Sequence, residues 1–127
     1  MFTNIPLHAP PCDSRIVCNS FLQIANSQTL ESLDPQKANK LVYLAHGFYL
    51  GNYGQPLIED RIEAWPYGPV VPKLYTELLK YMPGRIDFWN PRRFSGYAVS
   101  LGPPVVNLEI QTFLEEVWKV YGLYDGN

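Results

Sequence analysis

The amino-acid sequence predicts one mainly helical α+β domain, with about four helices and a small antiparallel β element. Four stretches carry apolar residues at three-and-four spacing, the period of a half-buried helix. Between the second and third of them, short apolar runs flank the charged letters "EDR", which is typical of brief strands. At 127 residues and 46% hydrophobic content, the chain is long enough for one core without a metal or disulfide.

The first expected helix follows a proline-rich start. Residues 1–12 contain three prolines and no periodicity, so we expect an extended arm there. Asp13 or Ser14 can cap the helix that follows, and its apolar face comprises Ile16, Val17, Phe21, Ile24 and Ala25. We place the domain proper at 13–122 and a short tail at 123–127.

The second helix has the clearest boundaries. Asp34 is expected as N-cap and Pro35 as the first helical residue, where a missing N–H costs nothing. Gly51 and Gly54 supply the stop. This helix should be the central packing element, and its expected buried stripe is Ala38, Leu41, Val42, Ala45, Phe48 and Tyr49.

The segment after this helix predicts a small hairpin or two edge strands, formed by Leu57-Ile58 and Ile62–Trp65. Pro66 should end the second strand because proline cannot donate to a ladder. The following letters, "WPYGPVVP", predict a rigid turn, in which Gly68 can take a conformation closed to other residues.

Two further helices complete the fold. One begins near Pro72 and stops at "MPG", with an apolar face of Val71, Leu74, Tyr75, Leu78, Leu79 and Met82. Residues 83–106 predict a long loop with room for one short strand at 97–101. The last helix has Asn107 as cap and Gly122 as C′ residue, and we expect Ile110, Phe113, Leu114, Val117 and Tyr121 to face inward.

Composition argues against several classes of protein. A formal net charge of −2 disfavours nucleic acid as the main partner. No apolar run approaches the length of a membrane span, and the N-terminus lacks the pattern of a signal peptide. Cys12 and Cys18 match no common metal or redox spacing, so we expect two thiols in a reducing compartment. We therefore expect a cytoplasmic protein with no membrane partner.

The candidates for chemistry are few. His46 is the best-placed base, and Glu63 lies inside the apolar "IEAW" run. We expect a packing or hydrogen-bonding role for His46 and an ion pair of Glu63 with Lys40 or Arg61. The alternative is an enzyme in which His46 and Glu63 share a pocket. No motif indicates a nucleophile, a phosphate loop or a metal site, so we predict no catalytic residue, no metal and no cofactor.

Two aromatic groups are candidate binding surfaces. Residues 85–97 combine three arginines with Phe88, Trp89, Phe94 and Tyr97. These rings either anchor the loop to the core, form a protein hot spot or stack on single-stranded nucleic acid, the weakest of the three options. Trp65, Tyr67 and Tyr75 surround the rigid turn and are either core rings or a preorganised platform.

The stretch "KLVYLAHGFYLGNYGQPLIEDRIEAWPYGPVVPKLYTEL" (40–78) resembles the core of the Panacea domain family of phage-associated, GepA-like proteins. The shared pattern is a K-L-x-Y-L-A-x-G helix, a G-x-P-L segment and I-E-A-W-x-Y-G-P-V-V before a helix with a tyrosine. The resemblance implies a mainly helical fold with a small β element. It also implies a bacterial or prophage protein, commonly the antitoxin that binds its toxin directly.

From this resemblance we expect a toxin-binding antitoxin. The alternative is a phage or prophage protein that inhibits or redirects a host factor, for example as a proteolysis adapter. The expected contact surface combines the turn with the 85–97 loop, and its residues are Trp65, Tyr67, Pro69, Tyr75, Trp89, Arg92 and Arg93.

Overall fold

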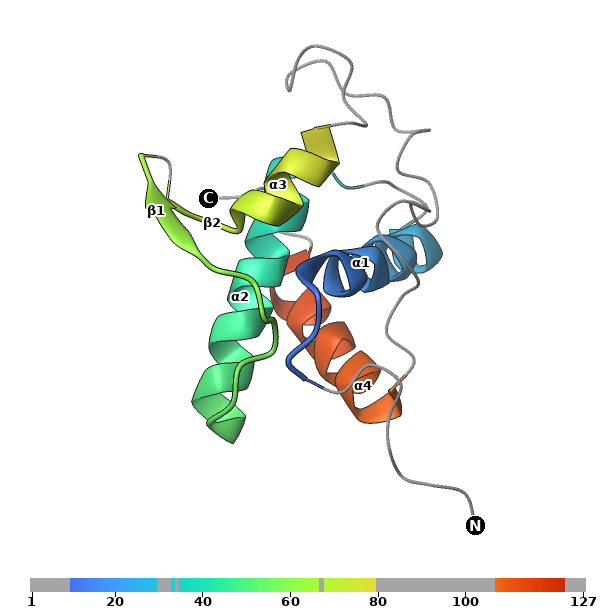
Figure 1. Cartoon of the computed structure of the whole chain (residues 1–127). Helices are drawn as coiled ribbons and strands as arrows, with labels where there is room; N and C mark the ends of the chain where they lie inside the picture. The colour runs from blue at the N-terminus through green and yellow to red at the C-terminus, as the bar shows by residue number, and fades with distance from the viewer. Residues whose placement is uncertain (1–9, 30–32, 34, 67, 80–106, 123–127) are drawn as a thin grey trace.

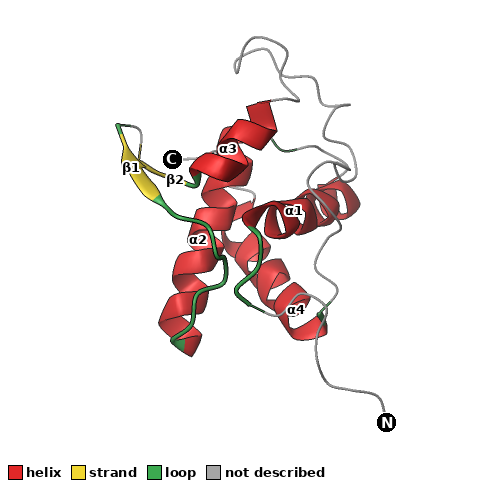
Figure 2. Cartoon of the chain, in the orientation of Figure 1, coloured by secondary structure: helices red, strands yellow, loops and turns green. Residues whose placement is uncertain are grey.

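The predicted fold class is confirmed by a computed structural model, which describes residues 10–29, 33, 35–66, 68–79 and 107–122. The helices are α1 (Ser14–Thr29), α2 (Pro35–Tyr53), α3 (Pro72–Leu79) and α4 (Leu108–Val117), and α4 continues into a π-helical turn, η3 (Trp118–Gly122). Strands β1 (Glu63–Trp65) and β2 (Gly68–Val70) form the β element (Figures 1 and 2). The 83–106 loop with its possible strand and the Asp34 cap lie outside the described residues.

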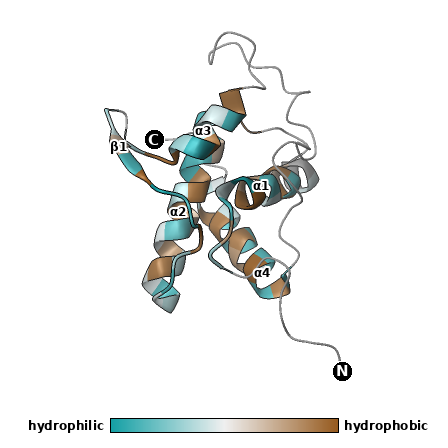
Figure 3. Ribbon diagram, in the orientation of Figure 1, coloured by the Kyte–Doolittle hydropathy of each residue, from teal (hydrophilic) through white to brown (hydrophobic). Residues whose placement is uncertain are grey.

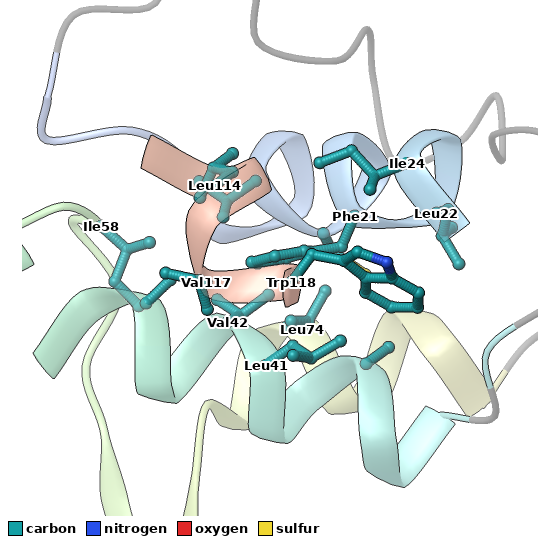
Figure 4. Close-up of a cluster of buried hydrophobic side chains, with 14 of the residues drawn as sticks. Phe21, Leu22, Ile24, Leu41, Val42, Ile58, Leu74, Leu114, Val117 and Trp118 are labelled. Atoms are coloured by element: carbon teal, nitrogen blue, oxygen red, sulfur yellow. The ribbon is translucent and has the colours of Figure 1, made fainter. Parts of the chain in front are cut away.

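Helix α2 is the central packing element, as predicted, because it contacts α1, α3, α4, η3 and β2. Helix α3 lies across its N-terminal half, and the hairpin lies beside both (Figure 1). The core fills the space between α1, α2, α3 and α4, as Figure 4 shows, and includes Phe21, Leu41, Val42, Leu74, Leu114, Val117 and Trp118. Within the described ranges, no helix has the length and apolarity needed to cross a bilayer.

The helix ends largely follow the predicted signals. Asp13 caps α1, because its Oδ1 accepts from the backbone N–H of Arg15 at 2.8 Å. Helix α2 begins at Pro35, and Asn107 caps α4 by accepting from Ile110 at 3.0 Å. Gly54 takes φ 70° after the last turn of α2, as a C′ glycine does. The prediction for Gly51 was wrong, since it lies inside the helix.

Two parts of the predicted core are wrong. Phe48 is 41% exposed and Leu79 is 38% exposed, because the apolar stripes of α2 and α3 continue where the packing is incomplete. Trp118 was not predicted to be buried, yet it is only 5% exposed. It packs over Gly122, where any Cβ would overlap the indole ring. The absence of a side chain at Gly122 therefore allows the Trp118 ring to approach the backbone closely.

One strand of the hairpin differs from the prediction. Leu57-Ile58 is not one of its strands; instead Ile58 forms an isolated parallel bridge with Cys12. The antiparallel partners are Glu63↔Val70, Ala64↔Pro69 and Trp65↔Gly68. The turn is therefore tighter than expected, and half of the proline-rich stretch is strand. Pro66 follows the end of β1 as predicted, and Gly68 takes φ 119°, a conformation that favours glycine.

Candidate functional site at the hairpin–helix corner

The hairpin and the start of α3 form a rigid corner whose centre is a pair of rings. Trp65, at the end of β1, and Tyr75, on α3, meet edge to face, with centroids 5.8 Å apart and an interplanar angle of 83°. Both side chains are half-buried, and Pro69 lies exposed on β2. We call Trp65, Pro69 and Tyr75 the corner. Tyr67 lies outside the described residues.

Glu63 fixes the indole of the corner. The Trp65 Nε1–H donates to Glu63 Oε1 at 2.9 Å, and the other carboxylate oxygen pairs with Arg61 Nη2 at 2.9 Å. The predicted pair with Arg61 is thus confirmed. The hydrogen bond from Trp65, followed by the charge of Arg61, lowers the pKa of Glu63. A carboxylate whose two oxygens both accept hydrogen bonds is a poor proton acceptor, so the role of Glu63 is to hold the indole of Trp65 in place.

Asn39 on α2 locks the link between β2 and α3. Its Oδ1 accepts from the Val71 N–H at 3.1 Å, and its Nδ2 donates to the Val71 carbonyl at 3.2 Å. Both residues are buried, so the Asn39 side chain takes the place of a β-ladder partner for the Val71 N–H, while the Val71 carbonyl also accepts from the backbone N–H of Tyr75 at 2.9 Å. Sequence analysis missed Asn39. The available signal was a polar residue between Ala38 and Leu41 on the buried face.

An open cleft of about 410 Å³ lies beside the corner, lined by Glu59, Asp60, Arg61, Pro72 and Lys73. Asp60 accepts from the Ser14 backbone N–H at 2.9 Å and from the Ser14 hydroxyl at 2.6 Å, which anchors the start of α1. Lys73 pairs with Asp13 at 3.2 Å. The cleft is therefore lined by charged side chains, and two of them, Asp60 and Lys73, are held in place by contacts with the start of α1.

His46 has the hydrogen-bonding role that we predicted. Its Nδ1 accepts from the backbone N–H groups of Leu57 and Ile58, each at 3.3 Å. This arrangement requires a neutral ring with its proton on Nε2. Burial lowers the pKa of His46, which favours that neutral form. His46 therefore fastens the segment between α2 and β1.

The enzyme alternative gains no support from these contacts. The hydrogen bonds of the described residues join His46 to the backbone and Glu63 to Trp65 and Arg61, and none joins the two side chains. Among the described residues, no three His, Cys, Asp or Glu side chains are grouped to hold a metal ion. Trp89, Arg92 and Arg93 of the expected contact surface lie outside the described residues.

The same stretch that forms the corner falls within a match to a known family. Residues 39–127 match the family described as "Antitoxin SocA-like, Panacea domain". The chain belongs to this family. Antitoxin SocA of Caulobacter vibrioides (strain NA1000 / CB15N) is 38% identical over 63 residues, which are 50% of this chain and 33% of the relative. This Panacea chain thus matches about a third of its relative's length. No solved structure matches it.

Proposed function

We propose that this Panacea-domain protein is an antitoxin that neutralises a cognate toxin by binding it directly through the corner. The observation that carries the proposal is the set of contacts that hold the two rings and the backbone beside them. Trp65 is held by Tyr75 and Glu63, while Asn39 fixes the backbone between β2 and α3. A surface that is already ordered loses little conformational entropy on association.

The composition of the corner suits a protein partner. Tryptophan and tyrosine dominate binding hot spots because each combines a large apolar ring with one polar atom. The exposed Pro69 adds apolar surface to the rings, and the charged cleft beside the corner provides a polar margin. Neutralisation by occlusion needs no turnover, so the proposal requires neither catalytic residue nor cofactor.

Four more residues belong to the proposed contact surface. Tyr67, Trp89, Arg92 and Arg93 supply further aromatic and guanidinium groups, the types enriched at hot spots. Single-stranded nucleic acid is the secondary option for the 85–97 loop. We further propose that this antitoxin is phage-associated and acts in the cytoplasm. The support for that compartment is that Cys12 and Cys18 are thiols and do not form a disulfide.

Co-expression with the product of the neighbouring gene tests the proposal. We expect that product to stop bacterial growth when expressed alone, and the wild-type protein to restore growth and co-purify with it. Trp65→Ala and Tyr75→Ala should weaken binding at least about tenfold, as hot-spot truncations do. Leu108→Ala is the matched control, because Leu108 is an apolar side chain, 77% exposed, at the far end of α4 (Figure 1).

Each other outcome has a defined meaning. If the stoichiometric partner is harmless alone but is degraded more quickly in the presence of this chain, the protein would be assigned as a proteolysis adapter and not as an antitoxin. Full binding by folded Trp65→Ala and Tyr75→Ala variants would place the contact surface elsewhere. Circular dichroism melts of each variant separate lost contact from lost folding.

A further inference from the structure

A second aromatic surface lies at the other end of α2. Rings from the C-terminal half of α2 meet rings from α4 and η3: Phe48 stacks on Tyr121 at 5.5 Å, and Tyr49 meets Phe113 edge to face at 5.4 Å. Tyr53 lies 4.6 Å from Tyr49 and 6.2 Å from Phe113 between centroids. We call these five rings the α2–α4 aromatic face. The corner lies against the N-terminal half of α2, so the two surfaces are separate (Figure 1).

The outer rings of this face are more exposed than core packing requires. Tyr49, Phe113 and Tyr121 are partly buried against the core, but Tyr53 is 60% exposed and Phe48 is 41% exposed. Figure 3 shows apolar residues in the C-terminal half of α2, before its paler last turn. Single exposed apolar side chains are ordinary, whereas two groups of contacting rings, which adjoin at the chain neighbours Phe48 and Tyr49, indicate an interaction surface.

The surroundings of the face are negatively charged. Glu109 lies one turn before Phe113 in α4, and this i,i+4 spacing places the two side chains next to each other on the helix surface. Residues 107–122 carry three carboxylates against one ammonium group. The last turn of α2 contains no basic residue, so its carbonyl end, which carries partial negative charge, has no cation from its own helix.

We propose that the α2–α4 aromatic face binds an arginine-bearing, partly apolar segment of a protein partner. A guanidinium over the exposed ring of Tyr53 gains a cation–π interaction. From there it can also reach the carboxylate of Glu109 and the negative end of α2. Apolar side chains of the same segment cover Phe48. This surface requires nothing of the corner, so it stands or falls independently of toxin binding there.

The test uses the full chain and a defined probe. A 12-residue peptide of alternating arginine and leucine is titrated into ¹⁵N-labelled protein, beside matched peptides with glutamine or glutamate in place of arginine. We expect the arginine peptide to shift the amide resonances of 46–53 and 107–122, with weaker binding at higher salt. Tyr53→Ser and Glu109→Gln should each weaken it about threefold to tenfold. Leu79→Ser, an exposed apolar position on α3, is the matched control.

Several results would overturn the proposal. Equal binding of all three peptides would show an apolar face without selectivity for charge, and shifts outside these two ranges would place the peptide elsewhere. Equal losses in Leu79→Ser would show non-specific adhesion. Concentration-dependent dimerisation, measured by sedimentation and abolished by Tyr53→Ser, would identify a second copy of this chain as the occupant. Thermal melts test whether each variant is folded. We expect Tyr53→Ser to fold because the Tyr53 side chain is largely exposed.

Discussion

Replacing Asn39 by leucine tests the physical basis of the corner. The substitution keeps the side-chain size but removes the donor and the acceptor that hold Val71. Val71 is fully buried, so its N–H would be left without a partner, whereas its carbonyl keeps the backbone N–H of Tyr75 at 2.9 Å. The loss at the N–H costs about 1–3 kcal/mol, and the added apolar contacts of leucine offset part of it. We expect the free energy of unfolding to fall by about 1–2 kcal/mol.

The free energy of unfolding of a domain of this size is about 5–15 kcal/mol, so the variant should remain folded at 25 °C. Urea denaturation followed by circular dichroism measures the change. The matched control is Gln36→Leu, the same type of substitution at an exposed position of α2, where we expect a change below about 0.5 kcal/mol. An equally small change for Asn39→Leu would refute the reasoning, because it would mean that Val71 finds other partners.

Asn39→Asp adds a second readout of the same contact. The introduced carboxylate can still accept from the Val71 N–H, but it repels the Val71 carbonyl and is buried. Burial and repulsion both raise the pKa of a carboxyl group. The folded variant therefore binds a proton more tightly than the unfolded chain, and the loss of stability should shrink as the pH falls from 7 towards 4. A deficit independent of pH would contradict the hydrogen-bond assignment.

Three further predictions concern the supports of the site. The pKa of His46 is lowered from 6.5 in the folded protein, so the stability that its hydrogen bonds give to the fold is complete above about pH 6.5. This stability is lost as the pH falls through the pKa of the folded state. Urea midpoints measured between pH 7 and 5 should show the decline, and His46→Gln should flatten it. Asp60→Ala leaves the buried Ser14 N–H and hydroxyl without their acceptor, so unfolding should become easier by about 2 kcal/mol, with Glu59→Ala as the exposed control. Gly122→Ala forces a methyl into the Trp118 ring and should lower the Tm by about 5–10 °C, whereas Gly47→Ala, with open space around its Cβ, should not. The same pH dependence in His46→Gln as in the wild type, no loss of stability in Asp60→Ala, or equal melts for the two glycine variants would contradict the respective contact.

Sequence periodicity predicted the helices well because each apolar face packs on the same core. The stripe through Leu41, Val42 and Ala45 is buried as expected. The same rule failed for Phe48, since periodicity describes a helix and not how far its neighbours extend. Capping residues such as Asn107 were predictable because a cap is a local contact of a side chain with the next turn.

The contacts that build the site could not be predicted in the same way. Asn39 and Val71 lie 32 residues apart, and Asp60 and Ser14 lie 46 residues apart. Their pairing follows from the tertiary fold, which no local pattern contains. The pair of Glu63 with Arg61 was predicted because the two residues are sequence neighbours. The assignment of Leu57-Ile58 to the hairpin was wrong because Ile58 pairs with Cys12, far away in the sequence.

The most direct measurement of the central claim is hydrogen–deuterium exchange on the complex with the product of the neighbouring gene. Our account predicts slower exchange at 63–66 and 68–79, the hairpin and α3, when the toxin is bound, and unchanged exchange at the exposed start of α4. A stable complex in which those segments exchange as in the unbound chain would contradict the assignment of the corner as the toxin-binding surface.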